Sequence, residues 1–75
     1  MQEQTIKLMS VEDITEFANA AEKCDFPVTV SRKGYSLEVD GRSVIGLTNL
    51  MGGNMIVHYG GENEEFTKVL QKYRN

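Results

Sequence analysis

The sequence predicts one α/β (α+β) domain over residues 1–75, an open-faced β-sandwich whose four-stranded, antiparallel-type sheet carries its helices on one face. Three observations support this prediction. The expected elements follow the order strand, helix, strand, strand, helix, strand, helix; the longer helices are amphipathic; and 75 residues can bury only one thin core. A right-handed crossover from the first strand to the second leaves a gap that the fourth strand can fill antiparallel. We expect the other face of the sheet to contact water.

A change of pattern near residue 9 separates the first strand from the first helix. Ile6 and Leu8 alternate with polar residues, as in a strand with one buried face. Ser10 is a favourable helix N-cap, and acidic residues follow it at the positive end of the helix dipole. The helix should end near residue 24 or 25, because Pro27 and the extended residue before it cannot continue it. Its expected apolar face consists of Val11, Ile14, Phe17, Ala18 and Ala21.

A hairpin and a short helix are expected in the middle of the chain. Val28 and Val30 alternate with polar residues, Lys33 and Gly34 form a turn, and a second strand follows. The inward side chains of that second strand are Tyr35, Leu37 and Val39. Between residues 40 and 53 the apolar spacing fits a short helix better than a strand, although Gly46 lowers the helix propensity.

The last strand lies between two glycine pairs and is followed by the last helix. Residues 55–59 form the strand, with His58 and its neighbour Ile56 on the more exposed face and Met55, Val57 and Tyr59 on the other. The final helix has glutamates near its start and basic residues near its end, which suits the helix dipole. Its apolar stripe consists of Phe66, Val69, Leu70 and Tyr73.

Composition and charge exclude several functions. The net charge of −3 comes with scattered basic residues and no basic stripe, so nucleic acid is not expected as a direct ligand. No apolar run approaches the roughly 20 residues that span a bilayer, and the polar start lacks the features of a secretory signal, which predicts a cytoplasmic, non-membrane protein. Cys24 is the only cysteine, so neither an internal disulfide nor a zinc site with paired thiolates can form. We expect no metal, no cofactor and no enzymatic activity.

The segment from Val39 to Leu47, Val-Asp-Gly-Arg-Ser-Val-Ile-Gly-Leu, resembles the regulatory-serine segment of HPr, the small phosphocarrier of bacterial sugar transport. In that family a basic residue, a serine, two aliphatic residues and a glycine open the short second helix. The resemblance extends over nearly the whole chain, through the element order and the spacing to the last helix. It implies the HPr-like fold and puts Ser43 at the regulatory serine position, with Arg42 as the neighbouring cation that would support a phosphate.

The chain departs from the family at the phosphate-accepting site. Members carry a histidine at the start of the first helix, followed by an arginine and a proline; here these positions hold Ser10, Glu12 and Asp13. A serine ester lacks the transfer potential of a phosphoramidate, and carboxylates would repel an incoming phosphate where the family offers a guanidinium. The chain is in this respect similar to the catabolite-repression paralogue of HPr, which lacks the histidine, keeps the serine and acts through partner proteins.

The resemblance leaves three functions open. We prefer a regulatory, protein-binding module of the phosphoenolpyruvate-dependent sugar phosphotransferase system, switched by phosphorylation of Ser43 and partnered by HPr kinase or a transcriptional regulator. The alternatives are an active phosphocarrier with a non-standard acceptor and an HPr-like domain used as a binding module outside sugar transport. Ser43 also has a purely structural interpretation, as an N-cap worth about 1 kcal/mol relative to alanine.

Two further predictions concern a partner surface and the single histidine. A short helix cannot bury all of its apolar side chains, so Leu47, Leu50 and Met51 are candidates for a surface that contacts a partner. His58 has no acid or thiol beside it in the sequence, and it is predicted to be an ordinary sheet-surface histidine rather than a phosphoacceptor or a metal ligand. The sequence leaves the oligomeric state open.

Overall fold

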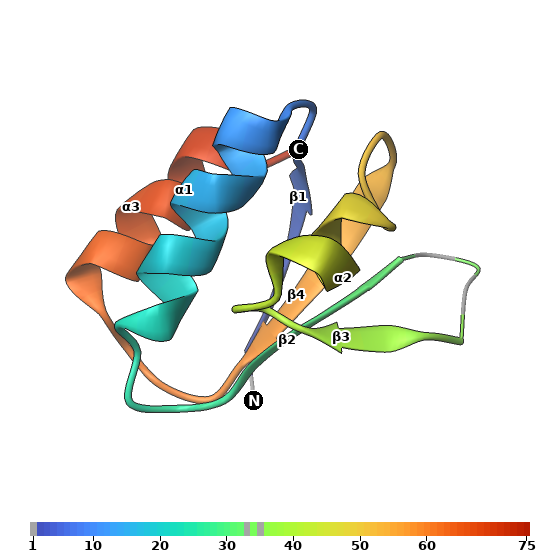
Figure 1. Ribbon diagram of the computed structural model, residues 1–75. Helices are drawn as coiled ribbons and strands as arrows, with labels where there is room; N and C mark the ends of the chain where they lie inside the picture. The colour runs from blue at the N-terminus through green and yellow to red at the C-terminus, as the bar shows by residue number, and fades with distance from the viewer. Residues whose placement is uncertain (1, 33, 35) are drawn as a thin grey trace.

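The computed structural model describes residues 2–32, 34 and 36–75. Its elements are β1 (Gln2–Lys7), α1 (Val11–Glu22), β2 (Val28–Arg32), β3 (Glu38–Asp40), α2 (Val44–Thr48), β4 (Asn54–Tyr59) and α3 (Glu64–Tyr73) (Figure 1). The strands form one sheet in the order β1-β4-β2-β3, and each neighbouring pair is antiparallel. β4 therefore fills the gap between β1 and β2, which confirms the predicted element order, topology and α+β class.

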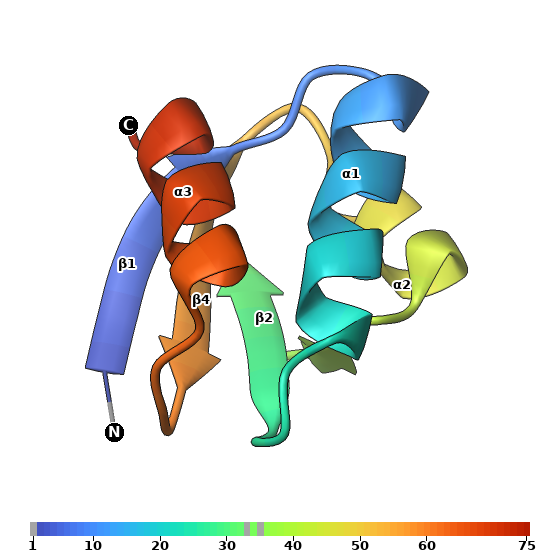
Figure 2. The ribbon, with the colours of Figure 1, turned by 90° about the vertical axis from the view of Figure 1, so that its left-hand side faces the viewer.

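The helices cover one face of the sheet and enclose the core with it. Figure 2 shows α1 and α3 side by side on that face, with α2 on the far side of α1. The ring of Phe66 lies at the centre of the packing, with its centroid 5.6 Å from that of Phe17 and 5.7 Å from that of Tyr59. The largest fully buried side chains are Phe17, Phe66, Ile6, Leu8, Ile14, Leu47, Leu50, Met55, Val30 and Val57.

Each helix begins at a residue whose side chain caps it. Ser10 has extended backbone angles, and its Oγ accepts a hydrogen bond from the Asp13 amide over 3.2 Å, as predicted for the start of α1. Asn63 does the same for α3, because its Oδ1 accepts from the Phe66 amide over 2.9 Å. Such caps satisfy first-turn amides that have no partner inside the helix, so they fix where each helix starts.

Close packing explains why position 46 of α2 is a glycine, although this residue weakens the sequence signal for the helix. A Cβ built at this position would lie 3.1 Å from Val39 Cβ and 3.2 Å from Ser43 Oγ, closer than most side chains tolerate. The glycine therefore lets the first turn of α2 lie against β3 at the cost of helix propensity. The predicted short helix is present, and it runs for only five residues.

Several details differ from the prediction. Val11 is 58% exposed, because the first residue of α1 lies beyond the part of the helix that covers the sheet. The second hairpin strand is shorter than expected, since β3 has three residues and Leu37, placed inward by the alternation, is 55% exposed outside it. The predicted turn residue Lys33 and strand residue Tyr35 lie outside the described residues. No helix in the described part of the chain is long and apolar enough to cross a bilayer.

Candidate regulatory site

Ser43 caps α2 and is half-buried. Its Oγ accepts a hydrogen bond from the Gly46 amide over 3.1 Å, and its own amide donates to the Asp40 carbonyl over 3.0 Å. The N-cap interpretation of Ser43 is therefore correct for the unmodified chain. The Ser43 side chain lies at the start of a short helix, in a surface hollow that Glu22, Asp40 and Arg42 also line.

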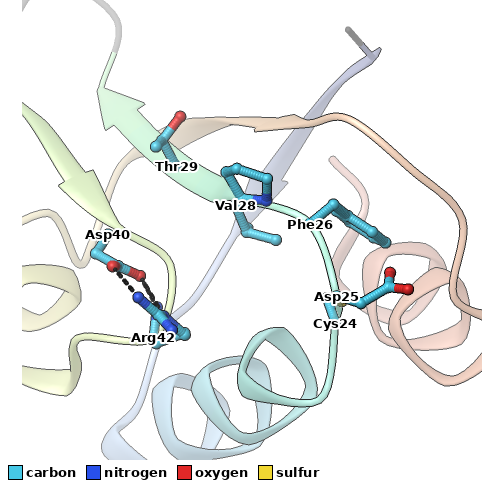
Figure 3. Close-up of a pocket in the computed structure, with 8 residues that line it drawn as sticks. Cys24, Asp25, Phe26, Val28, Thr29, Asp40 and Arg42 are labelled. Carbon is cyan, nitrogen blue, oxygen red and sulfur yellow. Dashed lines mark hydrogen bonds and ion pairs between the residues drawn. The ribbon is translucent and has the colours of Figure 1, made fainter.

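Arg42, the predicted phosphate-supporting cation, is held by Asp40. The guanidinium donates to both carboxylate oxygens, from Nε to Oδ1 over 3.1 Å and from Nη2 to Oδ2 over 2.9 Å (Figure 3). The Arg42 amide also donates to Asp40 Oδ1 over 2.8 Å, so the Asp40 carboxylate stabilises the turn that precedes α2. These hydrogen bonds from Arg42 hold the pKa of the Asp40 carboxyl below its usual value. Both side chains are about half exposed, so the pair is open to competition from another anion.

A shallow depression adjoins this pair. It lies where the α1–β2 connection passes the β3–α2 turn, as Figure 3 shows. Its lining residues are Cys24, Asp25, Phe26, Pro27, Val28, Thr29, Asp40 and Arg42. Cys24 is partly buried, its Sγ lies 3.5 Å from the Ala20 carbonyl oxygen, and burial raises the pKa of its thiol. A thiol in this state is a packing group and a poor nucleophile.

Asp13, which the resemblance puts at the family's proline position, belongs to an acidic junction between α1 and α3. Asp13 Oδ2 accepts a hydrogen bond from the Met9 amide over 3.0 Å, and its Oδ1 lies 3.2 Å from the hydroxyl of Tyr73. That hydroxyl also hydrogen-bonds to Glu16, which accepts from Lys72 Nζ over 2.9 Å as well. The structure thus brings Ser10 and Asp13 together as a cap, and it gives Asp13 a second contact with the last turn of α3.

Hydrogen bonds stabilise the ionised form of both carboxylates in this junction. The hydrogen bond from the Met9 amide is the main cause of the lowered pKa of the Asp13 carboxyl. The hydrogen bond from the Tyr73 hydroxyl, followed by that from Lys72, lowers the pKa of the Glu16 carboxyl. Burial, followed by the adjacent Glu16 carboxylate, raises the pKa of the Tyr73 phenol. Glu12 points to solvent. The carboxylates of Asp13 and Glu16 therefore carry their charge at neutral pH, which disfavours the approach of a phosphate.

The predicted partner surface on α2 is wrong in two of its three residues. Leu47 is fully buried and Leu50 is 1% exposed, because both face the core from one side of the short helical segment; Met51 is partly buried against the same core. The exposed apolar side chains lie on the other side. Ile45 is 79% exposed and Val44 is 40% exposed, directly after Ser43.

The structure also gives His58 neighbours that the sequence does not reveal. Its Nδ1 lies 3.3 Å from Glu3 Oε2, and its Nε2 lies 3.4 Å from Ser31 Oγ. These residues come from three adjacent strands, and alternation predicts which face each occupies but not which residues lie opposite one another. Within the described residues, no three histidine, cysteine, aspartate or glutamate side chains are grouped so that they could hold a metal ion.

The strand order and the packing of the helices on one face of the sheet define an open-faced β-sandwich of the HPr kind. A structural comparison supports this class: the crystal structure of HPr-C-His from Thermoanaerobacter tengcongensis superposes with a TM-score of 0.72, covering 96% of this chain and 89% of that one. The two sequences are 22% identical, so the likeness establishes the fold. No protein-family model matches the sequence, and a search of curated proteins finds no match.

Proposed function

We propose that this chain is a regulatory, protein-binding module related to HPr, one that belongs to the phosphoenolpyruvate-dependent sugar phosphotransferase system and is switched by phosphorylation of Ser43. The observation that carries the proposal is the surroundings of Ser43. In an HPr-like fold, this serine caps a short helix, follows Arg42 and precedes the exposed pair Val44 and Ile45. Its function is to bind proteins in the cytoplasm and not to catalyse a reaction.

The start of α1 supports a role other than phosphate carriage. Transfer of phosphate to a sugar permease needs a phosphoramidate on an imidazole, and the residue at that position is Ser10. Asp13 and Glu16 are committed to hydrogen bonds with α3, so the site is filled by anions with partners of their own. An incoming phosphate would meet carboxylates instead of a guanidinium.

Phosphorylation of Ser43 would alter the surface in a defined way. A phosphate adds a charge of roughly −1.5 to −2 at neutral pH and three strong acceptor oxygens. Those oxygens would compete with Asp40 for Arg42, whose guanidinium is exposed and within one residue of the phosphate. The new charge would stand beside Val44 and Ile45, so partners that bind this apolar pair would distinguish the two forms. We expect HPr kinase or a transcriptional regulator to be such a partner.

The test is the intact mass of the chain after incubation with a bacterial HPr kinase and ATP. The matched control is Ser43→Asn, because asparagine caps a helix about as well as serine and carries no hydroxyl to phosphorylate. We expect one phosphate on the wild-type chain and none on Ser43→Asn.

A parallel reaction with enzyme I and phosphoenolpyruvate tests the carrier alternative. We expect no acid-labile phosphate, since a phosphoramidate is acid-labile and a serine ester is not. Acid-labile phosphate from enzyme I would contradict the proposal and support a carrier with a non-standard acceptor. A wild-type chain that HPr kinase leaves unmodified would reduce Ser43 to a helix cap.

A further inference from the structure

The open face of the sheet carries a row of polar side chains that crosses three strands. In the register of β1 with β4, Glu3 is opposite His58, and in that of β4 with β2, His58 is opposite Thr29. Ser31 lies two residues along β2 from Thr29 and on the same face. The row faces away from the helices, since the alternate residues Val28, Val30 and Val57 are buried in the core.

His58 bridges an acid and a hydroxyl in this row. Nδ1 is 3.3 Å from Glu3 Oε2, and Nε2 is 3.4 Å from Ser31 Oγ. In neutral imidazole one nitrogen carries the proton and the other accepts one. The Glu3 carboxylate can only accept, so it favours the tautomer with the proton on Nδ1. Nε2 is then the acceptor, and the hydroxyl of Ser31 donates to it.

We propose that Ser31 is an acyl-acceptor site, with His58 as its general base and Glu3 as the residue that positions His58. A nucleophile, a base within reach of it and a third group that orients the base are the parts that activate a serine hydroxyl. The His58 side chain is 24% exposed and the Glu3 side chain 64%, so an acyl donor can reach the row from solvent.

The reaction is the transfer of an acyl group from a donor with a good leaving group. Ser31 Oγ forms a bond to the carbonyl carbon while its proton passes to His58 Nε2. The tetrahedral intermediate collapses, the bond from that carbon to the leaving group breaks, and the leaving group departs as an anion. His58 then releases the proton to water. The product is an ester on Ser31.

The geometry also limits the class of donor. β2 pairs with β3 on one side and with β4 on the other, so its amides serve the sheet and do not converge on a developing oxyanion. A donor whose leaving group is already stable, such as an aryl ester, needs less of that stabilisation than an amide. The site therefore accepts acyl groups from activated esters and does not cleave peptides.

The test is the acetylation of the full chain by p-nitrophenyl acetate, followed by peptide mapping. Ser36, an exposed serine between β2 and β3, is the internal control because no histidine is hydrogen-bonded to it in the described residues. General base catalysis typically contributes 100-fold or more. We expect Ser31 to be acetylated about 100-fold faster than Ser36, as an ester that hydroxylamine removes. Equal rates at the two serines, or acetyl groups on amines alone, would overturn the proposal.

Two variants separate the roles of the base and of the positioning residue. In His58→Gln we expect acetylation of Ser31 to fall about 100-fold, to the rate of Ser36. In Glu3→Ala we expect a smaller fall and a shift of His58 toward the tautomer with the proton on Nε2, visible in its ¹⁵N chemical shifts. Urea unfolding of both variants reports whether the fold is retained. An unchanged rate in His58→Gln, or an unchanged tautomer in Glu3→Ala, would exclude the assigned role.

Discussion

The hydroxyl of Tyr73, in the last turn of α3, hydrogen-bonds to the carboxylate of Glu16 in α1. Lys72 binds the same carboxylate, and the chain then continues along the edge of β1, where the Asn75 amide donates to the Thr5 carbonyl over 3.2 Å. The end of the chain is thus tied to both the first helix and the first strand. Because these contacts join elements at opposite ends of the sequence, they contribute to the stability of the whole fold.

Tyr73→Phe removes the hydroxyl and keeps the ring. We expect the free energy of unfolding to fall by about 1 kcal/mol, because a hydrogen bond to a charged group at a partly exposed site is lost. Urea denaturation followed by circular dichroism measures the change. Tyr59→Phe is the matched control, since the Tyr59 ring packs on Phe66 and its hydroxyl has no hydrogen bond within the described residues. An equal loss in both variants would argue against a specific role for the Tyr73 contact.

The acidic groups predict a loss of stability at low pH. The folded-state pKa values of Asp13, Glu16 and Asp40 lie below the ordinary 3.8 for aspartate and 4.5 for glutamate. A depressed folded pKa contributes stability that is present above the unfolded pKa and is lost as pH falls through the folded value. We expect the urea midpoint to be constant between about pH 7 and about pH 5 and to fall below about pH 4.5.

Tyr73→Phe supplies the control for that pH dependence. The Tyr73 hydroxyl is the largest cause of the lowered pKa of Glu16, so its removal should make the decline below about pH 4.5 shallower. The urea midpoint measured across the same pH series checks this. A decline of the same steepness in the variant would mean that Glu16 does not contribute to it.

Much of the fold can be predicted from the sequence, but the neighbours of individual side chains cannot. Ser10 and Pro27 delimit α1 by local chemistry, and the alternation in β4 places His58 on the exposed face, so the order and faces of the elements are predictable. The contact of His58 with Glu3 depends on strand register, and alternation leaves register undetermined. Tyr73 and Glu16 are likewise 57 residues apart and meet only after the two helices pack.

Gly41 lies where the chain after β3 passes close to β2. A Cβ at this position would stand 2.6 Å from Val28 Cγ1 and 3.1 Å from the Val28 carbonyl oxygen, which accepts the Gly41 amide over 2.8 Å. We expect Gly41→Ala to destabilise the fold by about 1–3 kcal/mol, since this overpacking cannot be relieved without moving the backbone. Thermal unfolding measures the loss. Gly60→Ala, with nothing within 4 Å of its added Cβ, is the control and should be close to neutral.

Leu47 and Ile45 test which side of α2 is the core side. Leu47 is fully buried and Ile45 is 79% exposed, although the two are separated by one residue. They lie about 200° apart around a helix of 3.6 residues per turn, and a five-residue helix is too short for the apolar pattern to distinguish the sides. We expect Leu47→Ala to cost about 2–5 kcal/mol of unfolding free energy through the cavity it leaves.

Ile45→Ala should change the free energy of unfolding by less than about 0.5 kcal/mol, because the side chain it truncates is mostly in water. Urea denaturation of the two variants under the same conditions compares them directly. If Ile45→Ala were as costly as Leu47→Ala, then Ile45 would be buried in solution and unavailable to a partner. A large loss in Leu47→Ala alone leaves Val44 and Ile45 as the apolar side chains of α2 that a partner can bind. Partner binding should then be measured on Ile45→Ala, the variant expected to keep its fold.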